Sequence, residues 1–424
     1  MSEPAFNHEA LLQAVRDLPV DSLTASRRDA ANLFVARGFP TVRDEDWKYT
    51  DLSNVIEISQ QSLQVASAPA AIDEDLLRQT QANLDAHWIV IANGKVLEQH
   101  SPGTNIPGVQ SGSLQKTDLA IDEPLADLNL ALLRDGLKLD ICAEFAPDKP
   151  LGLLFIDTVE NAVASTHARV NISLERNANA RIVEAHVSSG PAQHYSNCVL
   201  HLDLAEGAVC EYLRLQDRAT NHSQTARLNV SLKRDSSLHH GSFDLGGRLT
   251  RNDLNVAIQG RNATARFNGL YIVADGQHVD NHTKVDHLVG PAISQQEYRG
   301  VLSGHCRAVW NGKAIVHKGA DGTDATQANH NLLLSDAAEI DAKPELEIYA
   351  DDVKCAHGTT VGQLDERALF YLRARGISKP DAKRILTRAF AATIVNTSPI
   401  SEAHEFLGGQ VEERLRTIDD GRQS

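Results

Sequence analysis

The residue types best suited to chemistry lie together in one short segment, DDVKCAHG, which runs from Asp351 to Gly358. Within it Cys355 and His357 stand two residues apart, so on a regular strand they project to the same side, about 7 Å apart at the backbone. A thiolate and an imidazole are good ligands for iron, zinc or iron–sulfur clusters. Two ligands are only half of a four-ligand site. The residues alone therefore leave two interpretations open: half of a metal site, or a buried thiol beside a turn histidine.

A catalytic Cys–His dyad is the rival functional interpretation of the same pair. It needs a third group that orients the base, and an oxyanion site. The neighbours Asp351 and Asp352 would raise rather than lower the pKa of the Cys355 thiol, which argues against a nucleophile. The sequence contains no GxxxxGK[ST], GxSxG, HExxH or CxxC motif. The densest histidine groups, at 239–240 and 278–287, are expected to be surface residues without a special role.

The strand that leads into this segment poses a problem of register. Residues 343–350 alternate between apolar and polar side chains, which predicts a strand. If that strand continues without a break, Cys355 and His357 lie on its outer face, whereas Asp352 and Lys354 point inward, which is costly in an apolar core. We therefore expect either a bulge that resets the register, or the end of the β-structure with its edge covered by something else.

The middle of the chain repeats one pattern: an apolar strand, a polar turn and a second strand. Four copies start 29, 29 and 26 residues apart, at Val170, Val199, Leu228 and Leu254. Repeats of this period indicate stacked units that bury their apolar faces on their neighbours. The regular spacing favours a mainly β fold with a β-helix, or solenoid, core over residues 76–362. A β-sandwich is the main rival, because strand pairs of this kind would also serve it.

Both ends of the chain read as helical. In the N-terminal region, residues 1–75, Ser22 is expected to cap a helix that ends near Arg37, and residues 60–71 resemble a linker. The C-terminal region, residues 363–424, predicts further helices. One helix carries an apolar face, and a last helix carries apolar residues at steps of four, four and three. The first face comprises Ala382, Ile385, Leu386, Ala389, Phe390 and Ile394, and the second comprises Leu407, Val411, Leu415 and Ile418. Such faces must dock on something, either a partner or the chain's own β-core.

Composition narrows the classes of function. The formal net charge of −15 argues against nucleic acid or an anionic membrane as the main partner, because both are bound through excess Lys and Arg. No apolar run approaches the roughly 20 residues that span a bilayer. The N-terminus has no signal-peptide pattern. The five cysteines are an odd, scattered set that fits free thiols, so we expect a cytoplasmic protein.

Three segments carry a resemblance to a known family. Residues 345–377, which include DDVKCAHG, resemble the C-terminal part of the SufD branch of the SufB/SufD family, from the SufBCD iron–sulfur cluster assembly complex. RDEDWKYT at residues 43–50 and DNHTKVDH at residues 280–287 resemble the same family. The likeness thus extends over nearly the whole length of the chain, and the DDVKCxHG block is its most specific part.

The resemblance implies a right-handed parallel β-helix with helical regions at both ends. It implies a scaffold subunit without turnover of its own, which pairs with SufB through the β-helix ends. The C-terminal helices would bind the ATPase SufC, and this function maps onto the helix face Ile385, Leu386, Ala389, Phe390 and Ile394. His357 would face a SufB cysteine where a nascent cluster is built, and Cys355 is the weaker ligand candidate at the same interface.

The same resemblance sets expectations about cofactors. Iron or an iron–sulfur cluster would be held transiently at the SufB interface, and this chain alone would bind no cofactor stably. Reduced flavin is implied only for the whole complex, without an assignable residue. The sequence leaves open whether two copies of this chain pair in the absence of SufB. Two alternatives stay open: an enzyme on a solenoid, such as a polysaccharide lyase or hydrolase, and a stand-alone metal carrier with a full ligand set.

Overall fold

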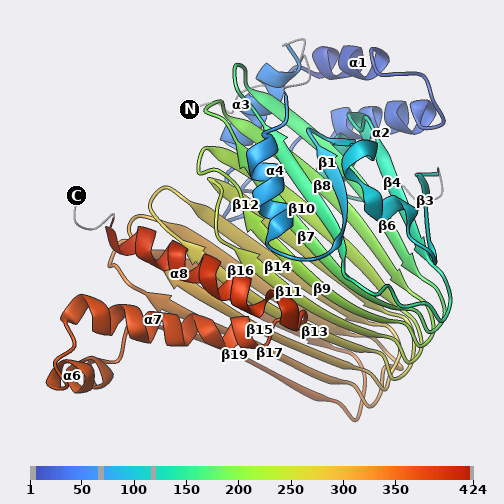
Figure 1. Ribbon diagram of the computed structural model, residues 1–424. Helices are drawn as coiled ribbons and strands as arrows, with labels where there is room; N and C mark the ends of the chain where they lie inside the picture. The colour runs from blue at the N-terminus through green and yellow to red at the C-terminus, as the bar shows by residue number, and fades with distance from the viewer. Residues whose placement is uncertain (1–5, 65–70, 116–120, 421–424) are drawn as a thin grey trace.

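The computed structural model describes residues 6–64, 71–115 and 121–420, and two long sheets of coiled strands dominate it (Figure 1). Sheet A has ten strands and sheet B has nine. The strands of sheet A, in chain order, are β1 (His87–Ala92), β2 (Lys95–Val96), β5 (Leu151–Thr158), β7 (Asn179–Ser189), β9 (Val209–Asp217), β11 (Ser237–Asp244), β13 (Thr264–Val273), β15 (Ile293–Leu302), β17 (Asp324–Leu333) and β19 (Lys354–Gly362). Those of sheet B are β3 (Val109–Ser113), β4 (Gly136–Ile141), β6 (Ala164–Leu174), β8 (His194–Leu204), β10 (His222–Leu232), β12 (Leu249–Ile258), β14 (His278–His287), β16 (Arg307–Val316) and β18 (Glu339–Ile348).

The chain alternates between the two sheets, so each strand from β4 onward pairs in parallel with the strand two further along. Each turn of the coil adds one strand to each sheet, and the coil has about eight turns. The four repeats seen in the sequence are successive turns of this coil. The expected mainly β fold is confirmed as a parallel β-solenoid, and the β-sandwich interpretation is wrong because the strands of a repeat lie in different sheets.

A residue with positive φ sits at most corners where the chain passes from sheet B to sheet A. Asn177, Asp235, Asn262 and Asp352 take φ values of 57°, 58°, 62° and 51°. Asn and Asp tolerate this left-handed conformation better than most residues, which explains why they recur at the turns. Asp352 is therefore a corner residue between β18 and β19. The expected bulge is wrong, because the strand ends and the chain turns to the other sheet.

Helices cover the outer faces of both sheets, and none in the described ranges is long and apolar enough to cross a bilayer. The α-helices are α1 (His8–Arg16), α2 (Thr24–Arg37), α3 (Ser53–Ser62), α4 (Glu74–Ala82), α5 (Pro124–Ala131), α6 (Glu366–Ala374), α7 (Lys379–Asn396) and α8 (His404–Asp420). The 3₁₀ turns are η1 (Glu45–Trp47), η2 (Glu98–His100), η3 (Pro102–Asn105) and η5 (Ser401–Ala403). Part of the linker expected at residues 60–71 lies outside the described residues.

The predicted N-terminal helix is present, although α2 begins after Leu23 rather than with Ser22 as its cap. The helix ends at Arg37, as predicted, and Gly38 follows it with φ 71°. Helices α3 and α5 pack on the outer face of β6 and β8 in sheet B. The segment between α2 and α3 also reaches sheet B, where the Trp47 ring centroid lies 4.4 Å from the Arg251 guanidinium. Thr50 Oγ1 donates to Asp280 Oδ2 at 2.5 Å. The RDEDWKYT and DNHTKVDH segments are thus in direct contact.

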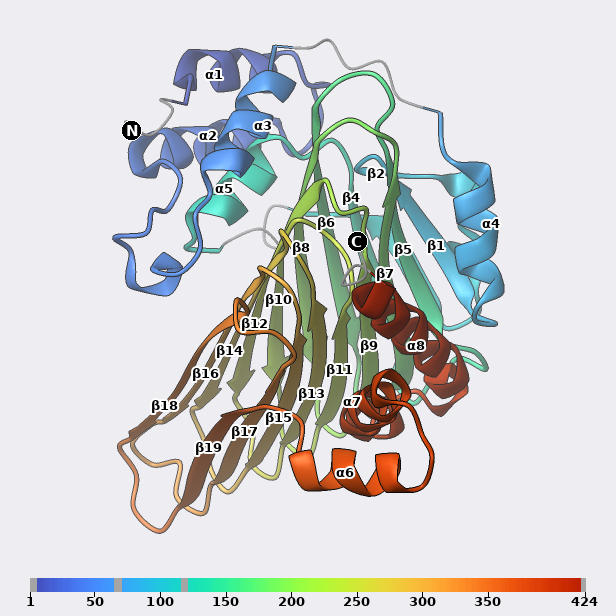
Figure 2. The ribbon, with the colours of Figure 1, turned by 90° about the vertical axis from the view of Figure 1, so that its left-hand side faces the viewer.

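The C-terminal helices α7 and α8 lie against the outer face of sheet A (Figure 2). All four predicted apolar residues of α8 are buried there, so its face docks on the chain's own core; they are Leu407, Val411, Leu415 and Ile418. Ile394 of α7 is also fully buried, in the same cluster as Val301 of β15. Ile394 was assigned to the same helix face as Ile385, but its side chain is buried in the chain's own core and offers no surface to a partner.

The two ends of the solenoid differ. At its beginning, β2 and β3 pair antiparallel with β1 and β4 and so occupy the outermost positions. At its end, β18 and β19 are the last strands of their sheets, and no described strand pairs beyond them (Figure 2). We call this the open end. Ile348 and Val361 keep 44% and 51% of their surface exposed there, although each continues an inward-facing row of the solenoid.

Ile394 provides a test of how α7 is held. The substitution Ile394→Ala is expected to destabilise the chain by roughly 2 to 5 kcal/mol, because it leaves a cavity in a packed core. Its matched control is Ile385→Ala on the same helix, where the side chain is 43% exposed, and the expected change is within about 0.5 kcal/mol. Urea unfolding of both variants measures this, and equal effects would contradict the described packing.

Candidate metal or cluster interface

Strand β19 carries both residues that the sequence singled out, and it places them at the open end. Cys355 pairs in register with Ala325 of β17, and His357 pairs with Gln327. Ala325 and Gln327 are buried between the two sheets. Because residues paired in a parallel sheet project to the same side, Cys355 and His357 face the interior of the solenoid. The predicted outer-face placement is wrong, since it assumed that the strand of residues 343–350 continued through Asp352.

Their inward direction does not make these side chains inaccessible. No strand in the described residues forms a further turn over them, so His357 is exposed and Cys355 is half-buried. Burial raises the pKa of the Cys355 thiol, and the nearby charge of Asp324 raises it further. The thiol therefore stays protonated at neutral pH unless a metal ion or a partner displaces the proton. This environment disfavours a free nucleophile.

The ligand set around the open end is incomplete within this chain. Among the described residues, no group of three or more His, Cys, Asp or Glu side chains is arranged to hold a metal ion. Cys355 and His357 are thus at most half of a tetrahedral site, as their number in the sequence suggested. All five cysteines, including Cys355, are free thiols.

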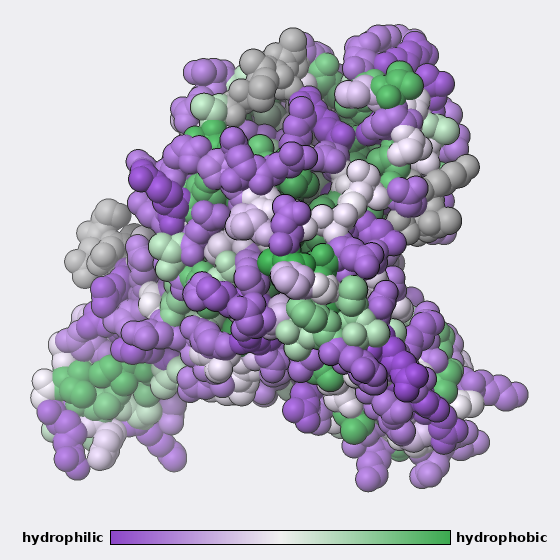
Figure 3. Space-filling model, turned by 45° about the vertical axis from the view of Figure 1, so that its right-hand side comes forward, coloured by the Kyte–Doolittle hydropathy of each residue, from purple (hydrophilic) through white to green (hydrophobic). Residues whose placement is uncertain are grey.

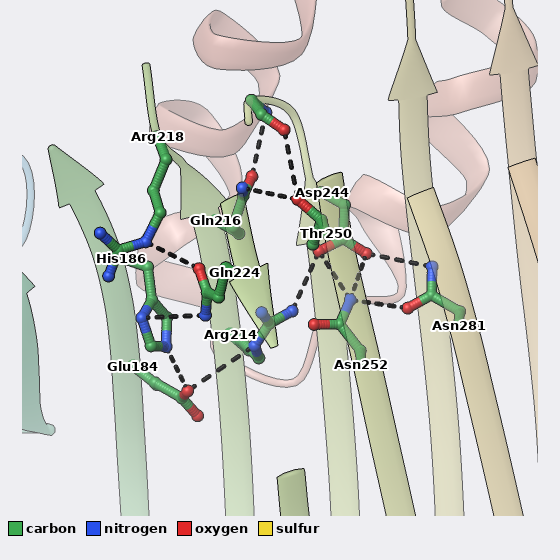
Figure 4. Close-up of polar contacts among 11 residues, drawn as sticks. Glu184, His186, Arg214, Gln216, Arg218, Gln224, Asp244, Thr250, Asn252 and Asn281 are labelled. Atoms are coloured by element: carbon green, nitrogen blue, oxygen red, sulfur yellow. Dashed lines mark hydrogen bonds and ion pairs between the residues drawn. The ribbon is translucent and has the colours of Figure 1, made fainter. Parts of the chain in front are cut away.

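The interior holds a second feature, a chain of polar contacts that bridges the sheets (Figure 4). His186 Nε2 donates to Glu184 Oε1 at 2.5 Å, and its Nδ1 accepts from Gln224 Nε2 at 3.2 Å. The hydroxyl of Tyr212 also donates to Glu184. The Arg214 Nε lies 3.6 Å from Glu184 Oε1. A neutral imidazole satisfies both contacts of His186, so the cluster is consistent with one tautomer.

Asp244 extends these contacts to sheet B. Its carboxylate accepts from Arg214 Nη1 at 3.0 Å and from Asn252 Nδ2 at 3.0 and 3.1 Å. Asn281 Nδ2 donates to it at 3.1 Å. A cavity of about 30 Å³ lies beside these residues and is lined by Arg214 and His240 among others. Its size and polar lining suit one or two water molecules.

The contacts of Glu184 and His186 determine whether each side chain is charged. Burial alone would raise the pKa of Glu184, but the hydrogen bond from His186 and the charge of Arg214 lower it to about 2. Burial lowers the pKa of His186 to about 4. At neutral pH a Glu184 carboxylate therefore lies beside a neutral His186. The cluster is enclosed and fully hydrogen-bonded at Glu184, so it stabilises the interior and offers no approach to a substrate.

The sequence interpretation missed this cluster because polar residues were expected to face outward. Glu184, His186, Arg214 and Asp244 occur at alternate positions of their strands, on the same inward-facing side as Tyr212. This alternation was the available signal. The expectation that the dense histidine groups lie at the surface is also wrong in part, since His240 and His287 are 3% and 0% exposed.

A separate apolar surface lies on the C-terminal helices. Phe370 and Tyr371 of α6 are 74% and 59% exposed, and Ile385 of α7 is 43% exposed. In Figure 3 apolar side chains gather on the protruding lobe that α6 and α7 form. Of the helix face predicted from the sequence, Ala389 is also exposed and Leu386 is half-buried. Phe390 packs on its own chain, where the Arg299 guanidinium lies 5.0 Å from the ring centroid.

Comparison with known proteins identifies related sequences. Residues 155–390 match the family model described as SUF system FeS cluster assembly, SufBD core domain, and residues 8–127 match the SufBD protein N-terminal region. The chain is 32% identical to the iron–sulfur cluster assembly protein SufD of Escherichia coli over 84% of this chain and 85% of that protein. It is 29% identical to the SufBD family protein slr0076 of Synechocystis, over 94% and 91%. It is 25% identical to ABCI7 from the chloroplast of Arabidopsis thaliana, over 95% and 90%.

The buried histidines predict that stability falls as the medium becomes acidic. Burial lowers the pKa of five of them from 6.5 to between about 3 and about 4: His167, His186, His194, His240 and His287. Below pH 6.5 the unfolded chain binds protons that the folded chain does not, so the free energy of unfolding decreases. Roughly 1 kcal/mol per histidine is expected to be lost between pH 7.5 and 5.5.

Asp127 acts in the opposite direction, because burial raises its pKa to about 6 and the folded state then binds the extra proton. Burial also raises the pKa of Glu123 and of Asp217. These three carboxyls do not offset the five histidines, to which the lowered pKa values of His222 and His278 add. Urea unfolding at pH 7.5 and 5.5 measures the net change. Equal free energies of unfolding at the two pH values would show that these histidines are not held neutral by burial.

Proposed function

This chain belongs to the SufB/SufD family of iron–sulfur cluster assembly proteins, and from that premise we propose that it is a scaffold subunit of a SufBCD-type complex. In this proposal it pairs with a SufB subunit through the open end and binds the ATPase SufC through its C-terminal helices. It contributes His357, and secondarily Cys355, to the site where iron and sulfide are assembled. The observation that carries the proposal is the open end, where Cys355 and His357 lie on the last strand of sheet A and the outer edges of β18 and β19 have no strand partner among the described residues.

The unpaired edges of β18 and β19 favour a β-structured partner. An exposed strand edge presents unpaired backbone N–H and C=O groups, which readily pair with another strand. At this edge Ile348, Tyr349 and Val361 are 44%, 62% and 51% exposed, so apolar surface accompanies the unpaired backbone. A second solenoid that abuts this end would satisfy both. In the absence of SufB, the same end would pair two copies of this chain.

The two candidate ligands are suited to different degrees. A neutral imidazole binds a metal through a nitrogen lone pair, and His357 is exposed at the open end. Cys355 is half-buried and its thiol pKa is raised, so it must lose a proton before it can ligate. His357 is therefore the primary ligand in this proposal. The remaining ligands would come from SufB, and the iron or cluster is cargo that leaves after assembly.

The surface proposed to bind SufC contains fewer residues of α7 than the sequence suggested. Phe370 and Tyr371 of α6, with Ile385 of α7, form the exposed apolar part, whereas Ile394 is buried within this chain. Hydrolysis of ATP by SufC would move the docked helices and the solenoids attached to them. This chain would perform no turnover itself and would work in the cytoplasm. Flavin, if present, would belong to the whole complex.

The ligand role of His357 is tested by His357→Ala in the chain co-expressed with SufB and SufC subunits. The complex is expected to co-purify as the unchanged chain does, while iron–sulfur cluster assembly in cells falls at least tenfold. The matched control is His330→Ala, because His330 lies on the adjacent strand β17 but bonds Thr360 on the outer side. Assembly that survives His357→Ala in an intact complex would refute the ligand role.

The ATPase surface is tested by Phe370→Asp. A charge at this 74% exposed position is expected to weaken SufC binding at least tenfold and to leave the pairing with SufB intact. Leu288→Asp is the control, since Leu288 is 41% exposed at a solenoid corner far along the chain from α6. Co-purification and circular dichroism of both variants are the measurements. If Phe370→Asp binds SufC normally, this surface is not the docking site.

A further inference from the structure

Gln327 lies next to His357 in the interior of the solenoid, and we propose that it is the positioning residue of that histidine. Its carboxamide oxygen would accept the N–H of the inner imidazole nitrogen and so leave the lone pair of the other nitrogen directed out of the open end. The inference rests on the proposed function, because it assumes that His357 is a ligand. It names a residue that neither the motif nor the family likeness singled out.

The register of the sheet supplies the first argument. His357 on β19 and Gln327 on β17 are direct partners in a parallel pair. Neighbouring strands lie about 4.8 Å apart, and paired residues project to the same side. A carboxamide and an imidazole at this separation are within reach of one another after a rotation about their side-chain bonds. Within the described part of sheet A, β19 is the last strand, so His357 has Gln327 as its one in-register neighbour.

The burial of Gln327 supplies the second argument. The residue is 3% exposed, yet neither its Nε2 nor its Oε1 has a hydrogen-bond partner among the described residues. Buried polar groups are nearly always hydrogen-bonded, and an exception calls for a cause. Here the cause is the position of Gln327 one strand below the open end, where a completed site would engage it.

The row continues inward from Gln327. Its partner on the other side is Gln296 of β15, which is also 3% exposed. Thr283 Oγ1 bonds Gln296 Oε1 at 2.6 Å, while Gln296 Nε2 has no partner among the described residues. Thr283, Gln296, Gln327 and His357 thus form a row of groups that can each donate and accept. We call it the glutamine row.

Hydrogen bonds along the glutamine row can point in either of two directions, toward His357 or away from it. In one direction each carboxamide nitrogen donates toward His357, so the inner imidazole nitrogen must accept and the outer nitrogen carries the proton. In the other direction His357 donates inward to the oxygen of Gln327, and Gln327 Nε2 donates to Gln296 Oε1, whose other lone pair accepts from Thr283 Oγ1. Only the second direction leaves the outer nitrogen free to bind a metal. Metal-ligating histidines almost always donate through their other nitrogen in this way.

Cys355 lacks comparable support, because its partner on β17 is Ala325, which is fully buried and carries no polar side-chain atom. The difference gives a structural reason why His357 is the better ligand of the two.

The experiment measures the imidazole ¹⁵N chemical shifts of the full chain labelled at histidine, with His357 assigned by comparison with His357→Gln. The variant Gln327→Glu can only accept, so it is expected to hold His357 in the tautomer with its proton on the inner nitrogen. The variant Gln327→Met is expected to shift the signals toward an unrestrained mixture of tautomers. The Met side chain has a shape similar to that of Gln, and it lacks the polar atoms that have no partner in the folded chain. The variant is therefore expected to fold, and circular dichroism checks this.

Titration with Zn²⁺ of the full chain in complex with its SufB partner gives a second readout. Affinity at the site that His357→Gln removes is expected to fall 10-fold to 100-fold in Gln327→Met, and to recover in Gln327→Glu. If both variants leave the His357 shifts and the Zn²⁺ affinity unchanged, Gln327 is not a positioning residue.

The two proposals fail in distinguishable ways. Altered ¹⁵N shifts in the Gln327 variants, together with normal cluster assembly in His357→Ala, would leave the contact standing and refute the ligand role. Unchanged shifts, together with lost assembly in His357→Ala, would refute the positioning role and leave the proposed function standing.

Discussion

Parallel pairing between each strand and the strand two positions further along is the interaction on which the rest of this structure depends. It forces the chain to alternate between two sheets, and it puts a sharp corner wherever the chain crosses from sheet B to sheet A. It aligns equivalent residues of successive turns in rows that run the length of the coil. Each turn adds one side chain to each row, so the side chains added turn by turn make a row apolar or polar. It also guarantees that the coil has two ends, where the pairing stops.

The sequence was a good guide where a local pattern determined the outcome. The four apolar residues of α8 dock as their spacing indicated. The strand pairs of the repeats were visible because each has apolar residues at alternate positions. These features depend on neighbours a few residues away, and a periodic pattern records such neighbours directly.

Prediction failed where the outcome depended on a neighbour about thirty residues away. Parity counted through Asp352 sent Cys355 and His357 outward, because nothing in the count reveals that the strand ends at Ile348 and that Asp352 adopts positive φ in the corner that follows. Ile394 and Ile385 were assigned to one face of α7, although nine residues of helix place them about 180° apart, and only Ile394 lies in the buried apolar cluster that includes Val301 of sheet A. Gln327 carried no signal on its own, and its relation to His357 exists only through the register of β17 with β19.

The interior rows connect the two polar features of the solenoid. Glu184, Arg214 and Asp244 form ion pairs with one another, and Asp244 accepts from Asn252 of sheet B, although Arg214 Nε and Nη2 have no hydrogen-bond partner among the described residues. The glutamine row, nearer the end, contains donors and acceptors without partners. Among the described residues, buried polar atoms without a partner therefore occur along the interior as well as next to the open end, where Gln327 pairs in register with His357.

The linear stacking of turns determines the order in which they unfold. In a solenoid each turn is supported mainly by the turns on either side, so thermal opening begins at an end and advances inward one turn at a time. The turn formed by β18 and β19 has a neighbour on one side only. It is therefore the first to fray, and with it the backbone that carries Cys355 and His357. Contact with a second solenoid would turn this terminal turn into an internal one. Docking of a partner and rigidification of the half-site would then be a single event.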